Sequence, residues 1–129
     1  MNDAELIALA TDARTRAYAP YSSFNVGAAL LAGNGQVFVG CNVENISFGL
    51  TMCAERVALG SALAKGVKDF RTIVVVSDSA EPVVPCGACR QVLAEFAPAM
   101  RVVSANLTGL IAEFRLGQLL PKPRQGILG

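Results

Sequence analysis

The sequence contains no histidine among its 129 residues. This absence excludes a Ser-His-Asp triad, a Cys-His nucleophile pair and any metal site with an imidazole ligand. A metal ion in this protein must therefore be held by thiolates or carboxylates.

Charged residues are also scarce. They make up 16% of the chain, against about a quarter in an average soluble domain. Small residues could dilute the charges, but for a protein of this size we expect part of the surface to be buried against other copies of the chain. The net charge is +1 and no basic patch with interleaved aromatic residues is present. A nucleic-acid polymer is therefore not an expected partner.

Long apolar runs are absent as well. No run approaches the ~18 residues that span a bilayer. The N-terminal stretch "MNDAELIALATDAR" has early acidic residues and no basic region before an apolar core, so it predicts an amphipathic helix and not a signal peptide. We therefore expect a cytoplasmic protein without membrane contact, in which thiols stay reduced and a disulfide framework is not expected.

Periodicity and turn signals predict a single domain over residues 1–129, with alternating helices and strands. The expected elements are a helix over 3–18, strands over 24–33 and 36–45 joined by an Asn-Gly turn, a helix over 53–66, a strand over 70–78, a helix over 86–96, and strands over 100–105 and 111–116. Strands that alternate with helices predict an α/β domain with a mixed sheet covered on both faces. Both cysteine-bearing helices follow strands, so their N-termini are expected to converge at the carboxyl ends of those strands.

The four cysteines are Cys41, Cys53, Cys86 and Cys89, and the stretch "PCGAC" spaces two of them three apart. Three interpretations fit this pattern. The first is a redox dithiol at a helix start. The second is a closed structural zinc site with four thiolates, although Cys41 and Cys53 are not spaced as the usual second pair. The third is a three-thiolate zinc site with an open position for water, as a catalytic zinc requires.

The stretch "TMCAERVALG" favours the third interpretation. Cys53 begins a predicted helix and Glu55 lies in the same first turn. An isolated glutamate there is usually only an acid that interacts with the helix dipole. Beside a thiolate, and with a second cysteine-bearing helix start in the chain, it becomes a candidate to move protons next to a metal.

The pattern C-A-E followed by P-C-x-x-C resembles the zinc-dependent cytidine deaminase superfamily, including its three-cysteine variant. Through "YAPYSSFNVGAALL", "GCNVENISFGLTMCAERVAL", "PCGACRQVLAEF" and "LLP", the resemblance to the small homotetrameric cytidine deaminases covers nearly the whole chain. It implies a three-layer α/β/α fold with a mixed sheet of about five strands and one Zn²⁺ per subunit. It also implies a homotetramer with sites near the subunit interfaces, and hydrolytic deamination of cytidine and 2′-deoxycytidine in pyrimidine salvage.

The resemblance also assigns residues. It implies Cys53, Cys86 and Cys89 as zinc ligands and Glu55 as the proton shuttle, while substrate contacts are implied for Phe24, Asn42, Glu44 and the backbone near Ala54 and Val84. Zinc with three thiolates carries a formal charge of −1, which weakens the metal as a Lewis acid. We expect Arg56 to compensate by donating to a thiolate sulfur; Arg90 is a weaker candidate that we expect to pair structurally.

Three further positions bear on the assembly and the substrate. Phe48 matches a family aromatic that reaches a neighbouring subunit's site, and Cys41 is interpreted as a buried structural thiol. Relatives usually have an aromatic three residues after "LLP", where this chain has Arg124.

Two alternatives to cytidine deamination remain: a deaminase of a modified cytosine nucleoside such as blasticidin S, and a non-catalytic zinc-binding or redox protein.

Overall fold

A five-stranded mixed sheet with strand order β2-β1-β3-β4-β5 organises the chain, as a computed structural model of residues 1–123 shows. The expected α/β class is confirmed. The elements are α1 (Asp3–Arg14), β1 (Val26–Ala32), β2 (Val37–Cys41), a 3-10 turn (Phe48–Leu50), α2 (Ala54–Ala64), β3 (Phe70–Ser77), α3 (Gly87–Phe96), β4 (Arg101–Asn106), β5 (Ile111–Arg115) and α4 (Leu116–Leu119).

Strand direction places three carboxyl ends together. β1 pairs antiparallel with both β2 and β3, so β2 and β3 run in the same direction. β3 pairs parallel with β4, and β5 returns antiparallel along β4. The carboxyl ends of β2, β3 and β4 therefore lie at one edge of the sheet, where ligands bind in open α/β folds.

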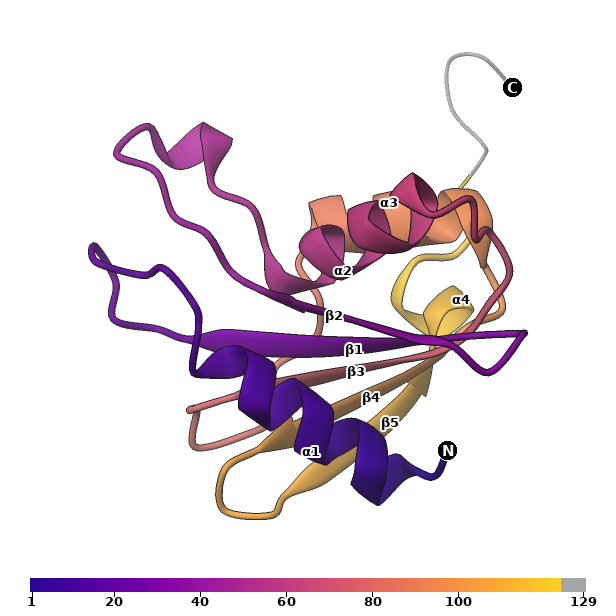
Figure 1. Cartoon of the computed structure of the whole chain (residues 1–129), viewed down its shortest axis with the longest axis horizontal. Coiled ribbons are helices and arrows are strands. Elements are labelled where there is room, and N and C mark those ends of the chain that lie inside the picture. Colours follow the sequence, from indigo (N-terminus) through magenta and orange to yellow (C-terminus); the bar gives the residue numbers. More distant parts are fainter. Residues whose placement is uncertain (124–129) are drawn as a thin grey trace.

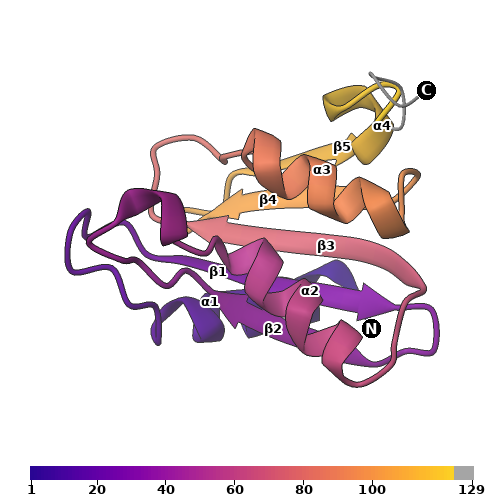
Figure 2. The ribbon, with the colours of Figure 1, turned by 90° about the horizontal axis from the view of Figure 1, so that it is seen from above.

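The helices form two layers. α1 covers one face of the sheet, and α2 and α3 lie side by side over the other (Figures 1 and 2). β3 is buried on both faces: Val74 and Val76 pack with α1, whereas Ile73 and Val75 pack with α2 and α3. Because successive side chains of a strand point to opposite faces, both sets must be apolar. This explains why "FRTIVVVSD" shows no polar alternation.

Glycine on β2 sets the position of α2. A Cβ atom at Gly40 would lie 2.3 Å from the Ala54 carbonyl oxygen and 2.6 Å from the Ala58 nitrogen. Only glycine therefore lets the first turn of α2 rest directly on the sheet. The start of this helix, which carries Cys53, is fixed at the carboxyl end of β2 as a consequence.

The helix expected over 3–18 is shorter than predicted. It ends at Arg14, and Thr15 caps it. The Tyr18 N–H donates to the backbone carbonyl of Asn42 at 2.9 Å, so residue 18 joins the segment that follows β2 instead of continuing the helix. Tertiary hydrogen bonding thus overrides the apolar periodicity. The 3-10 turn and α4 were not predicted, because each is too short to show periodicity.

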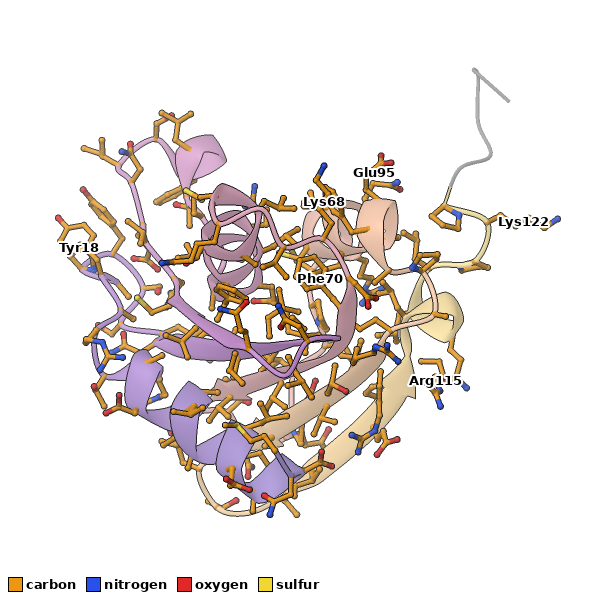
Figure 3. The ribbon with its side chains drawn as sticks, turned by 45° about the vertical axis from the view of Figure 1, so that its right-hand side comes forward. Tyr18, Lys68, Phe70, Glu95, Arg115 and Lys122 are labelled. Atoms are coloured by element: carbon orange, nitrogen blue, oxygen red, sulfur yellow. The ribbon has the colours of Figure 1, made fainter. Side chains whose placement is uncertain are left out.

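At the other end of the sheet, aromatic packing closes the core. Phe70 lies between the sheet and the α2–α3 layer (Figure 3). Its ring meets that of Phe96 edge-on, with centroids 6.4 Å apart. Edge-to-face pairs of this kind contribute about 0.5–1.5 kcal/mol beyond the area that they bury.

A salt-bridge network centred on Arg101 joins α1 to strands β4 and β5. Arg101 donates to Asp3 at 2.9 Å and to Glu113 at 2.8 Å. Hydrogen bonding to Arg101 holds the pKa of Asp3 below its ordinary value. The contribution of Asp3 is therefore complete above its unfolded pKa of ~4 and is lost as the pH falls through its folded pKa.

We expect Asp3→Asn to lower the free energy of unfolding by about 1 kcal/mol or less at pH 7, because the pair is partly exposed and screened. The difference from wild type should shrink as the pH falls through the folded pKa of Asp3 and should be absent below it. Urea unfolding at pH 7 and at a pH below this titration measures the difference. An equal deficit at both would show that the lost interaction does not depend on the charge of Asp3.

Candidate active site

Three of the four thiols meet where two helices begin. Cys53 is the N-cap residue of α2, Cys86 is the N-cap residue of α3, and Cys89 lies in the first turn of α3. The Cys53 and Cys86 sulfurs are 3.7 Å apart, and those of Cys86 and Cys89 are 3.3 Å apart. All three sulfurs lie within 4.8 Å of one another, and Cys41 is not part of this group.

The helix starts supply a favourable environment for thiolates. The Cys89 N–H donates to the Cys86 sulfur at 3.4 Å, as the first turn of α3 requires. Free N–H groups at a helix N-terminus carry partial positive charge, which stabilises nearby anions. Two such helix starts face the same three sulfurs, so the fold itself favours their charged form.

The spacing of the sulfurs fits a zinc ion. Zinc binds thiolates at ~2.3 Å, and tetrahedral geometry then places two ligand sulfurs ~3.8 Å apart. The Cys53–Cys86 separation of 3.7 Å matches this value, and the 3.3 Å of Cys86–Cys89 is slightly short of it. All four cysteines are present as free thiols. Three thiolates leave one tetrahedral position open, so the closed four-thiolate interpretation does not fit this geometry.

The thiols of Cys53 and Cys89 shift each other's pKa in opposite directions. A hydrogen bond from Cys89, helped by Arg56 and Cys86, lowers the pKa of Cys53 to about 5. The same interaction raises the pKa of Cys89, and burial raises it further. The lowered pKa of Cys53 favours its thiolate form, and a bound cation would favour the loss of the remaining protons.

Arg56 lies where a charge-compensating residue is expected. Its guanidinium donates to the Thr51 carbonyl at 3.0 Å and to the Cys53 sulfur at 3.9 Å. Arg90 does not reach a sulfur. Its guanidinium donates to the Pro85 carbonyl at 2.7 Å and to the Leu119 carbonyl at 3.2 Å, which agrees with the structural role expected for it.

Glu55 is buried beside the thiols, with 4% of its surface exposed. Burial raises the pKa of its carboxyl group to about 7, and the Cys53 thiolate adds to this effect. Its own backbone N–H and the Cys89 thiol oppose the shift. A carboxyl group with a pKa near neutrality can both accept and release a proton.

A cavity of about 230 Å³ opens beside the cluster. It is lined by Phe24, Val26, Asn42, Thr51, Cys53, Ala54, Glu55, Val75, Val83, Val84 and Cys86. Four positions expected to contact substrate, Phe24, Asn42, Ala54 and Val84, are thus brought together with two thiols and Glu55. Glu44 lies instead in an adjoining cavity of about 290 Å³ with Tyr21, Ser22, Phe48 and Thr51.

Asn42 and Glu44 also build the wall of the site. The Asn42 side chain donates to the Phe24 carbonyl at 2.8 Å and accepts from the Val26 N–H at 2.9 Å. The Glu44 carboxylate accepts from the Tyr21 N–H at 3.0 Å, and from the backbone and hydroxyl of Ser22. Both side chains therefore fix the loop that carries Phe24, a role that "NVEN" alone did not reveal.

Several lining residues escaped the sequence analysis. Val26, Val75 and Val83 are apolar residues of strands or loops, and Thr51 precedes the cysteine motif by two positions. Their side chains carry no chemistry that would distinguish them in the sequence. Only Val83 had a usable signal, because it lies next to Val84 and just before "PCGAC".

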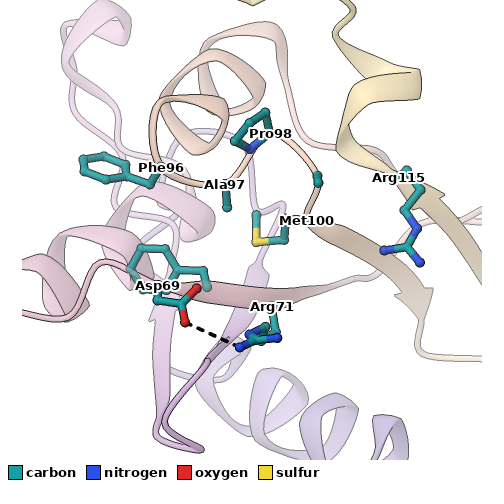
Figure 4. A pocket seen from close by; sticks show the side chains of 9 residues that line it. Asp69, Arg71, Phe96, Ala97, Pro98, Met100 and Arg115 are labelled. Carbon is teal, nitrogen blue, oxygen red and sulfur yellow. Dashed lines mark ion pairs between the residues drawn. The ribbon is translucent and has the colours of Figure 1, made fainter.

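A larger cavity of about 520 Å³ lies at the opposite end of the sheet, where β3 begins (Figure 4). Its lining includes Arg71, which pairs with Asp69 at 3.6 Å, and Arg115. It contains no cysteine. The smaller cavity brings together thiols, a buried carboxyl group and an arginine, so size does not decide which cavity is the functional one.

The two basic residues after "LLP" differ in what the structure describes of them. Lys122 is exposed and has a backbone φ of 52°, whereas Arg124 lies outside the described residues. Within residues 1–123, no helix is both long and apolar enough to cross a membrane.

The chain is similar in sequence to known deaminases. The family model described as "Cytidine and deoxycytidylate deaminase zinc-binding region" matches residues 1–105. A cytidine deaminase of Halalkalibacterium halodurans is 54% identical over 117 residues, which cover 90% of this chain and 89% of that protein. A Blasticidin-S deaminase of Bacillus cereus is 35% identical over 92% of this chain and 89% of its own length.

A solved structure agrees in both fold and sequence. The crystal structure of cytidine deaminase from Burkholderia pseudomallei superposes with a TM-score of 0.91 and is 52% identical in sequence. The match covers 94% of this chain and 98% of that one. The expected three-layer architecture with a five-stranded mixed sheet is therefore confirmed.

Proposed function

Because the chain belongs to the cytidine and deoxycytidylate deaminase zinc-binding family, we propose that it converts cytidine and 2′-deoxycytidine to uridine and 2′-deoxyuridine. The reaction adds water at C4 of the base, breaks the C4–N bond and releases ammonia. It belongs to pyrimidine salvage. The observation that carries this proposal is a buried carboxyl group, Glu55, beside a cluster of three thiols with one open side.

We propose Cys53, Cys86 and Cys89 as the ligands of one zinc ion per chain. Bound zinc supplies Lewis-acid activation of a water molecule at neutral pH. Arg56 withdraws charge from Cys53 through the contact described above, which offsets the excess negative charge of three thiolates. The two helix N-termini act in the same direction.

Glu55 is the proposed proton carrier. Its carboxylate takes a proton from the attacking water and delivers it to N3 of the pyrimidine. It then takes the proton of the hydroxyl group added at C4 and passes it to the amino group, which leaves as ammonia while C4 becomes a carbonyl. Its pKa of about 7 supports this cycle, because neither the charged nor the neutral form is strongly favoured at neutral pH. Phe24, Val75 and Val84 give the cavity beside Glu55 an apolar wall.

The two adjoining cavities suggest how a nucleoside binds. The base occupies the cavity that contains Phe24, Ala54 and Glu55, with Phe24 against its ring. The ribose extends past Thr51, which lines both cavities, towards Asn42 and Glu44. A carboxylate and an amide can accept from and donate to a sugar hydroxyl. The KM for cytidine of Phe24→Leu and Glu44→Gln variants tests these contacts, and unchanged values would exclude them.

The test of the function is the ultraviolet change when the purified protein is mixed with cytidine, 2′-deoxycytidine or blasticidin S, with zinc measured in the same sample. We expect conversion of the two nucleosides and about one zinc per chain. Conversion of blasticidin S alone would support the modified-nucleoside alternative. Zinc without conversion would support a non-catalytic role, and a protein that neither binds zinc nor converts a substrate would refute the proposal.

We further propose a homotetramer. Large apolar side chains are exposed around the site, and they include Tyr18, Tyr21, Ile46, Phe48 and Leu50, of which Phe48 is 76% exposed. Contiguous exposed apolar surface is typical of interfaces. Phe48 also lines the cavity that contains Glu44, so a neighbouring chain that covers it would help to complete the sugar site. Sedimentation equilibrium tests the assembly, and a monomer at micromolar concentration would contradict it.

A cytoplasmic location is proposed on chemical grounds. The three thiols must stay reduced to bind metal, and the cytosol keeps thiols reduced. Fractionation of cells that produce the protein, followed by immunodetection, tests this location.

A further inference from the structure

Residues 78–85, the segment that joins β3 to α3, carry part of the candidate site. Val83 and Val84 line the cavity beside Glu55, and Cys86 follows directly after Pro85. No regular secondary structure holds this segment, so its position depends on side-chain hydrogen bonds from the surrounding elements. The far end is fastened by Arg90, which donates to the Pro85 carbonyl.

The near end is fastened by Asn106, the last residue of β4. Its side-chain amide nitrogen donates to the carbonyls of Ser79 and Ala80, each at 3.0 Å. Asn106 is 4% exposed, and it pairs in register with Ser77 across the parallel strands β3 and β4. It therefore lies at the carboxyl edge of the sheet, where the segment leaves β3.

The oxygen of the Asn106 side-chain amide stabilises a second segment, the turn that follows β4. The Asn106 side-chain oxygen accepts from the Thr108 N–H at 3.1 Å, from the Thr108 hydroxyl at 2.9 Å and from the Leu110 N–H at 2.9 Å. Three donors face the oxygen and two carbonyls face the nitrogen, so only one orientation of the amide satisfies them all. An aspartate of the same shape could serve the turn but could not donate to the two carbonyls.

A serine pair extends the same fastening. The Ser77 hydroxyl lies 2.8 Å from that of Ser79, and Ser79 in turn donates to the Glu81 carbonyl. Ser77 is fully buried at the end of β3. Polar side chains of β3 and β4 thus hold residues 79 and 80 of the segment that leads to the cavity wall and to Cys86, and the Ser79 hydroxyl continues the chain of hydrogen bonds to residue 81.

From these contacts we propose that Asn106 is a positioning residue for the deaminase site, which holds the 78–85 segment so that Val83, Val84 and Cys86 keep their places. The inference rests on the proposed function for its kinetic consequence, whereas the geometry of the segment is independent of it. Displacing site residues by an ångström can cost up to about a hundredfold in catalysis. Loss of the two amide donors leaves two carbonyls without their partners.

The test compares Asn106→Asp with Thr108→Ala in the zinc-loaded protein. Asn106→Asp removes both donors to the segment and keeps an acceptor for the turn, whereas Thr108→Ala removes only one hydrogen bond on the turn side. Three quantities are measured: amide hydrogen exchange of residues 79–86, the rate of zinc release to a chelator, and kcat and KM for cytidine.

We expect Asn106→Asp to raise exchange in residues 79–86, zinc release and KM by about tenfold each, with a smaller fall in kcat. Thr108→Ala should leave all three near wild type. A merely structural role would instead lower the unfolding midpoint of both variants without a local rise in exchange or a change in KM. Wild-type exchange and KM in a folded Asn106→Asp protein would overturn the proposal.

A second variant covers the case in which Asn106→Asp does not fold. Ser77→Ala removes the hydroxyl contact to Ser79 on the same segment, and we expect a two- to threefold rise in exchange of residues 79–86. No rise in Ser77→Ala would then count against the proposal. If wild type does not convert cytidine, the proposed function fails, but exchange and zinc release still decide whether Asn106 holds the segment.

Discussion

Replacing Glu55 with glutamine is expected to lower kcat for cytidine by a hundredfold to ten-thousandfold, the range for loss of a general acid–base group. Glutamine has nearly the same shape but cannot take up or release the proton. The residue is buried and lies beside the thiols without being one of them. Zinc content should therefore remain at the wild-type value, and steady-state kinetics with a zinc assay on the same samples measures both quantities.

Glu113→Gln is the matched control, because it makes the same chemical change on the outermost strand β5, away from the residues that line the candidate site. We expect wild-type kcat for this variant. If Glu55→Gln turned over cytidine at the wild-type rate, Glu55 could not be the proton carrier. If it lost zinc as well as activity, the loss of activity would be attributed to the metal, and the proton role would need separate proof.

Replacing Cys89 with serine is expected to abolish stable zinc binding and, with it, deamination. Cys89 is the buried member of the cluster and its sulfur lies 3.3 Å from that of Cys86. A serine hydroxyl is a poor substitute for a thiolate, and only two sulfur ligands would remain. Metal analysis after gel filtration with a chelator should find less than about a tenth of the wild-type zinc.

Two further variants place this result on a scale. Cys41→Ser should retain wild-type zinc, because Cys41 lies outside the cluster. Arg56→Gln should retain less zinc than Cys41→Ser and more than Cys89→Ser. We expect a 10- to 100-fold loss in zinc affinity or activity, as is typical when a side chain that bonds to a metal ligand is removed. Zinc loss in Cys41→Ser equal to that in Cys89→Ser would restore the four-thiolate interpretation.

Much of the site could be predicted because its reactive residues lie in short sequence motifs. The motifs around Cys53 and Cys86 each place a thiol at the start of a helix, and such starts need only a few neighbouring residues to form. Glu55 follows from its place in the first turn of α2. The strands and the Asn-Gly turn followed from composition and spacing, and all five strands are present.

Other features depended on contacts between distant parts of the chain. The first helix ends at Arg14 because Tyr18 bonds with Asn42 and Glu44, across more than twenty residues. Asn42 and Glu44 were expected at the substrate, yet both also hold the loop that carries Phe24. In the sequence, an asparagine or glutamate that binds a ligand cannot be told apart from one that hydrogen-bonds to a loop of its own chain.

The sequence by itself determined the α/β class and the residue types of the site, because helix starts, strand periodicity and the spacing of the cysteines are local properties of the chain. The resemblance already implied which thiols meet and that Cys41 stands apart, but only the tertiary structure decided how they are placed and that Asn106 reaches the segment before Cys86. The contacts of Cys53 with the other two thiols and those of Asn106 with the segment join residues 26 to 36 positions apart in the chain. Their distances are set by the direction of the strands and by the close approach of α2 to Gly40, which no local pattern encodes.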